Sequence, residues 1–282
     1  MTREITSNKI VETVEDLCLE ANIDLAEDVV NALVKARETE ESELGREVLE
    51  RMLENAEVAR RKRIPICQDT GLTVLFLEVG QEVAITGGGL TAALNEGVRR
   101  AYIKGYFRKS VLADPLFDRT DTGDNTPAAV HTEIVPGSNL KISVLIKGGG
   151  SERVGKAQVL KPADGIDGVK KFVLEAVEEA GPNACPPMVV GVGCGGTLDH
   201  AAYIAKKALL RPIGPPNDDV QKARLEMEML EAINKLGFGP VGLGGRVTAL
   251  AVHLETYPVH ISALPVAVDL SCYALRRKSV VL

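Results

Sequence analysis

Hydrophobic positions near the N-terminus recur at the spacing of amphipathic helices. Between Ser7 and Arg63 apolar side chains return every three or four residues, in three successive stretches. Asp24 followed by Glu27 has the spacing of a capping box, and Ser42 stands where a third helix would need a cap. The pattern therefore predicts three helices in this segment.

The period changes after residue 63, where short apolar runs bounded by glycine and proline indicate strands between further helices. Strands are expected at 72–79, twice within 128–150 around the Pro136-Gly137 turn, at 186–196, and twice within 246–270 around Tyr257-Pro258. Helices are expected within 89–110, 167–181, 197–211 and 218–237. This order predicts a mixed α/β (α+β) fold, with a helical segment at 1–63 and an α/β body at 64–282 in a single domain over 1–282.

Composition narrows the class of protein. The chain has 282 residues, of which 45% are hydrophobic, so it can bury a large core. It contains no apolar run near the roughly 18 residues of a membrane span, and its first residues lack the apolar segment of a signal peptide, so we expect a cytoplasmic protein. A net charge of -6 argues against nucleic acid or an anionic membrane as the main partner.

The cysteines are the first candidates for chemistry. Five is an odd number without a secretory signal, and none has the C-x-x-C spacing of a zinc ribbon, so packing, catalysis or a metal cluster remain. Three dispersed thiols can hold three irons of a cubane and leave the fourth open as a Lewis acid, although spacing alone favours buried thiols. The five are Cys18, Cys67, Cys185, Cys194 and Cys272.

Two glycine-rich loops offer binding chemistry, each with a structural alternative. Gly191, Gly193 and Gly196 satisfy G-x-G-x-x-G after a strand, but a proline-rich loop stands where a ribose-binding acidic residue on a second strand would be needed. A nucleotide-binding oxidoreductase is therefore a minor alternative. The glycine run at 148–150 either exposes N–H groups to an anion or makes a tight turn.

The stretch 118–135 is rich in turn-forming and polar residues. It is either a solvated loop or a loop that faces a substrate, and the residues alone leave both open. The polar side chains in question are Asp121, Thr122, Asp124, Asn125 and His131.

Five segments in order resemble one known family. They are "PICQDTG", "GDNTPAAVHTEIVPG", "LIKGGGSE", "ACPPMVVGVGCGGT" and "LPVAVDLSCYALRR". They span about three quarters of the chain and resemble the iron-sulfur (class I) fumarate hydratase and L-tartrate dehydratase family. The closest likeness is to the α subunit of its two-subunit form.

The resemblance implies a [4Fe-4S] cluster on Cys67, Cys185 and Cys272, with Cys194 as a bystander. It implies reversible hydration of fumarate to L-malate, a reaction of the tricarboxylic acid cycle, or dehydration of tartrate to oxaloacetate. In both, an iron polarises a C–OH bond while a proton leaves the neighbouring carbon.

Further site residues follow from the same motifs. The resemblance implies that Gln68 and Asp69 contact substrate, with Asp69 as acid or base. Arg108 would hold a substrate carboxylate, because the guanidinium can pair with it in a bidentate manner. Gly148 and Gly149 would present backbone N–H groups.

The resemblance also implies partners. His260 would enter the site of a neighbouring protomer, which requires a dimer of α chains. The remaining arginines, a lysine and a threonine of the site belong to a C-terminal domain in the family, so a separate β subunit is expected, in an assembly of two α and two β chains. The rival from another class is a non-catalytic dimerisation or regulatory module with a degenerate site.

Overall fold

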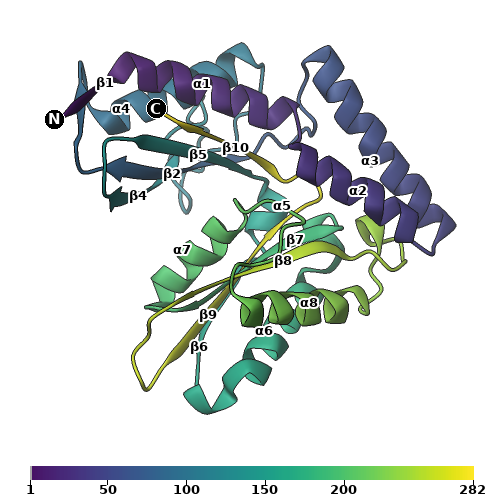
Figure 1. Cartoon of the computed structure of the whole chain (residues 1–282). Coiled ribbons are helices and arrows are strands. Elements are labelled where there is room, and N and C mark those ends of the chain that lie inside the picture. Colours follow the sequence, from purple (N-terminus) through teal and green to yellow (C-terminus); the bar gives the residue numbers. More distant parts are fainter. Residues whose placement is uncertain (1) are drawn as a thin grey trace. The chain divides into compact units, whose positions relative to one another are not determined.

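The computed structural model of the chain describes residues 2–282 and divides into two compact units (Figure 1). Unit 1 comprises the chain up to Ala26, Ala56–Gly149 and Arg276–Leu282, and unit 2 comprises Glu27–Asn55 and Gly150–Leu275. The helical segment predicted at 1–63 therefore contributes to both units. The assignment of 1–282 to one domain stays a prediction.

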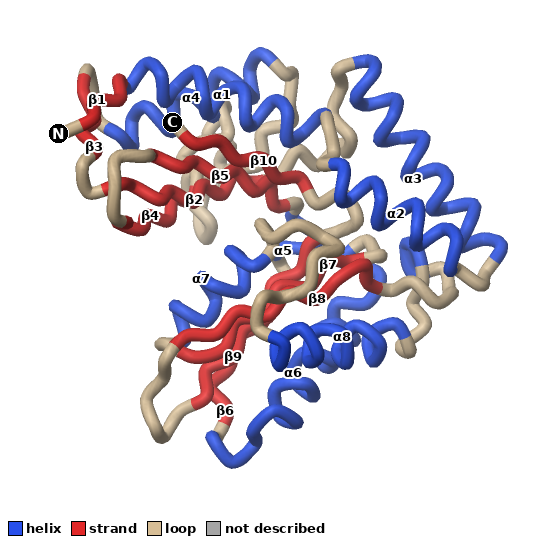
Figure 2. Tube along the Cα trace, in the orientation of Figure 1, coloured by secondary structure: helices blue, strands red, loops and turns tan. Residues whose placement is uncertain are grey.

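Helices and strands are interspersed along the chain, with three successive helices near its start and three successive strands at its end (Figure 2). The helices are α1 (Ser7–Ile23), α2 (Glu27–Thr39), α3 (Glu43–Lys62), α4 (Leu90–Lys104), α5 (Gly149–Glu152), α6 (Gly165–Ala180), α7 (Leu198–Ala208) and α8 (Val220–Asn234). The strands are β1 (Arg3–Thr6), β2 (Leu72–Gly80), β3 (Val83–Thr86), β4 (Ala129–Val135), β5 (Leu140–Lys147), β6 (Lys156–Leu160), β7 (Met188–Gly195), β8 (Ala249–Tyr257), β9 (Leu264–Ser271) and β10 (Arg276–Val281). The mixed α/β fold predicted from the sequence is confirmed.

Local capping explains where the N-terminal helices begin. The Thr6 hydroxyl accepts the Lys9 N–H (3.3 Å) at the start of α1, and the Ser42 hydroxyl accepts the Gly45 N–H (3.1 Å) before α3, as predicted. The capping box predicted at Asp24 is wrong, because α2 begins only at Glu27. Asp24 instead ends α1, and its carboxylate lies 3.4 Å from the Lys278 ammonium.

Unit 1 is built on a four-stranded mixed sheet in the order β10-β5-β2-β4. Strand β2 pairs in parallel with β4 and antiparallel with β5, so it lies between two strands that follow each other in sequence. Helices α1 and α4 pack against each other and share one apolar core with β2 and β5. A short parallel pair, β1 with β3, stands beside this sheet.

Unit 2 is built on a second four-stranded mixed sheet in the order β6-β9-β7-β8. Helix α7 packs against β7 and β9, while α6 and α8 share a separate core with the same strands (Figure 1). Every residue of β7 is buried, as expected for a strand covered on both faces.

The two sheets share one topology. In each, a central strand (β2 or β7) is followed by a helical crossover to a parallel neighbour (β4 or β8), and the next strand returns antiparallel on the other side (β5 or β9). Cys67 lies just before β2, and Cys185 just before β7. Each unit thus presents a cysteine at the start of its central strand.

A buried carboxylate fixes the α2–α3 loop within unit 2. Glu40 is 2% exposed, and its two oxygens accept backbone N–H groups from Glu41, Ser42, Arg246 and Val247 at 2.8–2.9 Å. Burial alone would raise the pKa of Glu40, but these four bonds outweigh it and hold the pKa below its ordinary value. The loop before β8 is thereby tied to the helical pair.

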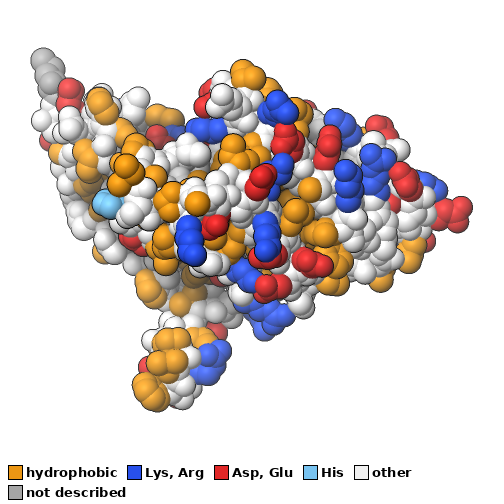
Figure 3. Space-filling model, turned by 90° about the horizontal axis from the view of Figure 1, so that it is seen from below, with side chains coloured by type: hydrophobic (Ala, Val, Ile, Leu, Met, Phe, Trp, Pro, Cys, Tyr) orange, Lys and Arg blue, Asp and Glu red, His pale blue; other side chains and the backbone are white. Residues whose placement is uncertain are grey.

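One face of the molecule is mixed in charge. On the face drawn in Figure 3, Lys and Arg side chains lie interspersed with Asp and Glu, with hydrophobic side chains between them. Among residues 2–282 the structure contains no helix with both the length and the hydrophobicity needed to span a membrane.

Candidate functional site

The row Cys67-Gln68-Asp69-Thr70-Gly71 occupies an irregular segment between α3 and β2 in unit 1. Gly71 has φ +68°, and a Cβ there would lie 2.5 Å from the carbonyl oxygen of Lys147, so no other residue fits without moving β5. Gln68 is exposed and Asp69 is half-buried. The Cys67 Sγ lies 3.5 Å from the Gln68 side-chain oxygen.

The Asp69 carboxylate is held by the backbone. Its Oδ1 accepts the Gly71 N–H (3.0 Å), and its Oδ2 accepts the Gly149 N–H (2.7 Å) at the start of α5. A Cβ on Gly148 would stand 3.1 Å from the same Oδ2, so a small residue is favoured there. The structure therefore brings three predicted site residues of unit 1 together, with the Gly149 N–H directed at Asp69.

Arg108 is tied to the same row through its backbone. The buried Thr70 hydroxyl donates to the Arg108 carbonyl (2.7 Å), while the Arg108 side chain is exposed. Asn125 is fully buried; its amide donates to the Gly71 carbonyl (3.1 Å) and its side-chain oxygen accepts the Ser110 N–H (2.7 Å). Asn125 thus connects the row to the segment that carries Arg108.

The rest of the polar stretch 118–135 is an irregular segment with bends up to Ala128, followed by strand β4. The Asp121 carboxylate accepts the Gly123 N–H (2.5 Å), and the Asp124 carboxylate accepts both the N–H and the hydroxyl of Thr126. His131 stacks on Phe76, its neighbour across the β2–β4 pair, with ring centroids 5.1 Å apart. Turn chemistry and packing account for these side chains.

Cys185 and Cys272 come close together within unit 2. The Tyr273 N–H, next to Cys272, donates to the Cys185 carbonyl (3.4 Å), as the end of β9 lies beside the start of β7. Cys185 is exposed and has φ +53°, a left-handed conformation that is costly for a residue other than glycine. Such strain is found most often at functional sites.

An ion-pair cluster braces the end of β9 that leads to Cys272. The Lys206 ammonium, on α7, lies 2.5 Å from a Glu152 carboxylate oxygen and 3.3 Å from an Asp269 carboxylate oxygen. Burial would lower the pKa of Lys206, but the two carboxylates raise it above its ordinary value. This ion-pair cluster could not be predicted from the sequence, because its three residues are far apart along the chain.

The five cysteines divide by exposure. Cys67 and Cys272 are partly exposed and Cys185 is exposed, whereas Cys18 and Cys194 are buried. Burial raises the pKa of both buried thiols to about 12, which disfavours their thiolate forms. None of the five, all within the described part of the chain, forms a disulfide.

His260 lies in the exposed turn between β8 and β9 of unit 2. Its Nδ1 accepts the Ser262 N–H (3.2 Å) and lies 2.8 Å from the Ser262 hydroxyl oxygen. With Nδ1 engaged as an acceptor, the neutral ring carries its proton on Nε2. The other ring nitrogen is therefore presented as a donor.

The glycines of β7 serve packing. A Cβ on Gly191 would lie 2.1 Å from the carbonyl oxygen of Ala205, and a Cβ on Gly193 would lie 2.1 Å from that of Ala201. The backbone of α7 therefore approaches β7 too closely for a side chain. Residues 212–219 form a loop before α8, so the second strand of a dinucleotide-binding fold is missing at that point.

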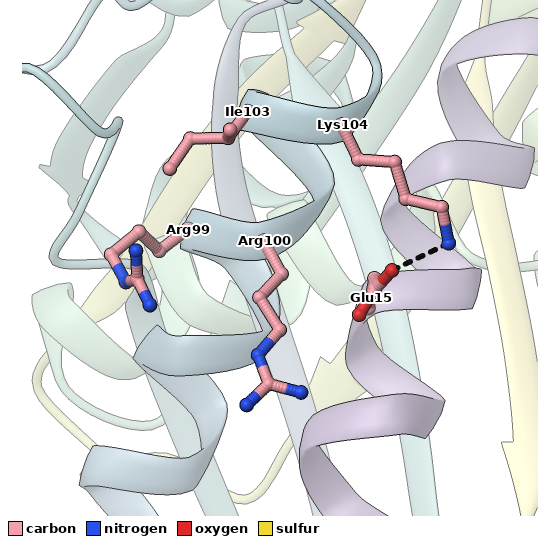
Figure 4. Close-up of a pocket in the computed structure, with 5 residues that line it drawn as sticks. All are labelled: Glu15, Arg99, Arg100, Ile103 and Lys104. Atoms are coloured by element: carbon pink, nitrogen blue, oxygen red, sulfur yellow. Dashed lines mark hydrogen bonds and ion pairs between the residues drawn. The ribbon is translucent and has the colours of Figure 1, made fainter.

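A surface depression on unit 1 is a poor candidate for the site. It is lined by side chains of α1 and α4, which Figure 4 shows around a Lys104–Glu15 ion pair (2.8 Å). Arg99 and Arg100 each pair with Glu96 at 2.7 Å. Their charges are already matched by carboxylates of the chain.

Comparison with known proteins connects this geometry to a family. A profile of the fumarate hydratase (fumerase) family matches residues 11–281. The chain belongs to the fumarate hydratase family. The resemblance inferred from five short motifs is thus confirmed for this family of hydro-lyases.

Individual relatives of this member of the fumarate hydratase family have more specific names. A provisionally named L(+)-tartrate dehydratase subunit alpha of Methanocaldococcus jannaschii is 42% identical over 275 residues, 95% of this chain and 96% of that protein. The L(+)-tartrate dehydratase subunit alpha of Escherichia coli O157:H7 is 36% identical over 274 residues, 96% of this chain and 89% of that protein.

The predicted ligands of this family member fall in both units. Cys67 belongs to unit 1, and Cys185 and Cys272 belong to unit 2. Within the residues the structure describes, 2–282, no three His, Cys, Asp or Glu side chains form a ready metal site.

The structure adds residues that sequence reasoning missed. Within unit 1, Arg276 and Tyr102 donate to carbonyl groups of the Cys67 row, and Asn22 accepts a hydrogen bond from Arg276. Tyr102 and Asn22 lie on stretches predicted as helices, and Arg276 lies on β10, which the sequence did not predict.

Proposed function

We propose that this chain is the α subunit of an iron-sulfur hydro-lyase that acts on a four-carbon dicarboxylate. The observation that carries the proposal is the division of the cysteines: the three that stand at the family's ligand positions are the three that are at least partly exposed, whereas Cys18 and Cys194 are buried. A thiolate, and not a thiol, binds iron, so thiols with a pKa near 12 in the core are poor ligands.

The donor set of Cys67, Cys185 and Cys272 fits a [4Fe-4S] cluster with one iron left open. In support, Cys185 and Cys272 lie at the adjoining ends of β7 and β9, and Cys67 stands at the matching position before β2. When bound, the cluster would supply a Lewis-acidic iron that polarises the C–OH bond of the substrate.

The chain's own residues have distinct tasks in this proposal. Asp69 handles the proton that accompanies the departing or attacking hydroxyl, with Oδ2 kept in place by the Gly149 N–H. Arg108 pairs with a substrate carboxylate, and Gln68 donates or accepts a hydrogen bond beside it. His260 enters the site of a neighbouring α chain and acts there through Nε2.

Two reactions of this class suit the site. Reversible hydration of fumarate to L-malate is our first assignment, and it agrees with the description of the family. Dehydration of L(+)-tartrate to oxaloacetate is the second, and it is favoured by the names of the relatives that are 36–42% identical. Each reaction adds or removes one water at the two adjacent carbons that carry the carboxylates.

A companion chain is part of the proposal. The relatives named above are called alpha subunits, and we infer that a β subunit supplies the remaining substrate-binding groups. The expected assembly contains two α and two β chains in the cytoplasm. A non-catalytic module would show neither iron nor turnover.

The test is anaerobic purification with the candidate β subunit, followed by iron and sulfide analysis and separate assays on fumarate and L(+)-tartrate. Cys67→Ser, Cys185→Ser and Cys272→Ser should each lose most of the iron, while Cys18→Ser and Cys194→Ser serve as matched controls and keep it. Full iron in the first three variants, or its loss in Cys194→Ser alone, would refute the ligand assignment.

A further inference from the structure

The carbonyl groups of the Cys67 row are held by buried side chains from separate elements. The row is irregular, so its carbonyls lack the partners that a helix or sheet provides. Arg276 of β10 donates to the Asp69 carbonyl (2.6 Å), Tyr102 of α4 to the Thr70 carbonyl (2.5 Å), and Asn125 to the Gly71 carbonyl (3.1 Å). The carbonyl groups of three successive residues are therefore each fixed by a side chain from another part of unit 1.

Arg276 is an unusual choice for such a task. It is 2% exposed, its Nη1 also donates to the Asn22 side-chain oxygen (3.1 Å), and its buried Nε has no hydrogen-bond partner. It forms no ion pair with a carboxylate in the part of the chain that the structure describes. Burying a guanidinium without a directly paired carboxylate is unfavourable for folding, which points to a role for Arg276 other than stability.

The guanidinium of Arg276 lies near the carboxylate of Asp69. A Cβ on Gly148 would lie 3.4 Å from Arg276 Nη2 and 3.1 Å from Asp69 Oδ2, so the cation and the carboxylate border the same glycine. The Asp69 main chain is fixed by Arg276, and its two carboxylate oxygens are fixed by the N–H groups of Gly71 and Gly149. Asp69 is therefore held both at its main chain and at its carboxylate.

We propose that Arg276 is a positioning residue for Asp69. The guanidinium locks the peptide group that follows Asp69 and thereby sets the direction of its side chain toward the substrate. The guanidinium itself is held by a hydrogen bond to the side-chain oxygen of Asn22, which lies in the last turn of α1. The inference rests on the proposed role of Asp69 in proton transfer, and it adds a residue of β10 that does not itself touch substrate.

The choice of arginine over lysine follows from the same geometry. One Nη1 serves a carbonyl and an amide oxygen together, and the planar guanidinium presents these N–H groups in a fixed fork. A lysine keeps the charge but presents its donors from one flexible point. Arg276→Lys should therefore fold and be impaired, and Arg276→Ala should be impaired further.

The experiment uses the anaerobically purified enzyme with its β subunit and compares Arg276→Ala, Arg276→Lys and the control Lys278→Ala. Lys278 is a cation on the same strand that pairs with Asp24. In Arg276→Ala we expect kcat to fall about 10–100-fold with KM within about threefold and with iron content unchanged, because misplacing a catalytic group affects the chemical step. Added guanidinium chloride at low concentration should restore part of the kcat of Arg276→Ala and none in Lys278→Ala.

A second readout is independent of turnover. Amide hydrogen exchange at Gly71 and Gly149 should be about 10-fold faster in Arg276→Ala than in wild type, because both N–H groups are bonded to Asp69. Lys278→Ala should leave it unchanged. If Arg276→Ala fails to fold, Arg276→Lys is measured in its place, with a smaller shift in both readouts expected.

The outcomes separate the two proposals. Unchanged exchange at Gly71 and Gly149, or kcat within twofold of wild type, overturns the positioning role of Arg276. An inactive wild-type enzyme that carries its iron overturns the proposed function instead, and the exchange measurement then still decides whether Arg276 holds Asp69.

Discussion

Replacement of Glu40 by glutamine should destabilise unit 2 without touching the proposed site. Glu40 is 2% exposed, and its carboxylate accepts four backbone N–H groups. Glutamine keeps one oxygen for the three donors on Oε1, but it turns an amide toward the Val247 N–H, which then lacks an acceptor. Losing a charged acceptor and leaving one buried donor unpaired gives a cost of about 2–4 kcal/mol.

The cost should depend on pH. The pKa of Glu40 is lowered in the folded protein from its ordinary value of 4.5, so its carboxylate contributes stability that is complete above that value. The contribution is lost as pH falls below 4.5 through the folded pKa. The difference between wild type and Glu40→Gln should therefore shrink between pH 7 and about pH 3.5.

Urea unfolding followed by circular dichroism at both pH values measures this difference. Glu41→Gln is the control, because its carboxylate pairs with Arg246 on the surface and such exposed pairs contribute little. Equal midpoints for wild type and Glu40→Gln at pH 7 would refute the reasoning, as would a penalty that stays the same in acid.

Two further predictions concern packing and the link to Arg108. Gly193→Ala should lower the melting temperature by several degrees, because its Cβ would enter the space of the Ala201 carbonyl, and a thermal scan showing no loss would contradict the proposed contact. Asn125→Ala should raise KM for the dicarboxylate about 10-fold, because the Arg108 segment keeps only the Thr70 hydrogen bond to the Cys67 row, and steady-state kinetics with unchanged KM would argue against the part of Asn125 in that connection.

Periodicity predicted most helices and the strands that carry apolar runs. It did not predict β1, β3, β6 or β10, none of which is longer than six residues. It also could not predict that β2 lies between β4 and β5, or β7 between β8 and β9, because a turn between two strands does not decide whether they pair. Strand neighbours depend on the crossover helices, which local pattern does not describe.

The residues of the candidate site could be predicted only in part from the sequence. Cys185 and Cys194 are alike in sequence terms, and only the structure separates an exposed thiol in a strained loop from a buried one in β7. The role of Arg276 could not be predicted, because an arginine side chain is ordinarily exposed to solvent and nothing in the sequence marks this one as buried. The glycines of β7 resembled a nucleotide loop, yet α7 packing explains them.

The central claim is that this member of the fumarate hydratase family works as an iron-dependent hydro-lyase subunit. Its most direct test is the rate at which the anaerobically purified chain, together with its β subunit, hydrates fumarate or dehydrates L(+)-tartrate before and after an iron chelator is added. We predict turnover of at least one of the two acids, abolished by the chelator and restored by iron and sulfide. No turnover of either acid by a preparation that holds its full iron, or turnover that survives complete iron removal, would contradict the account.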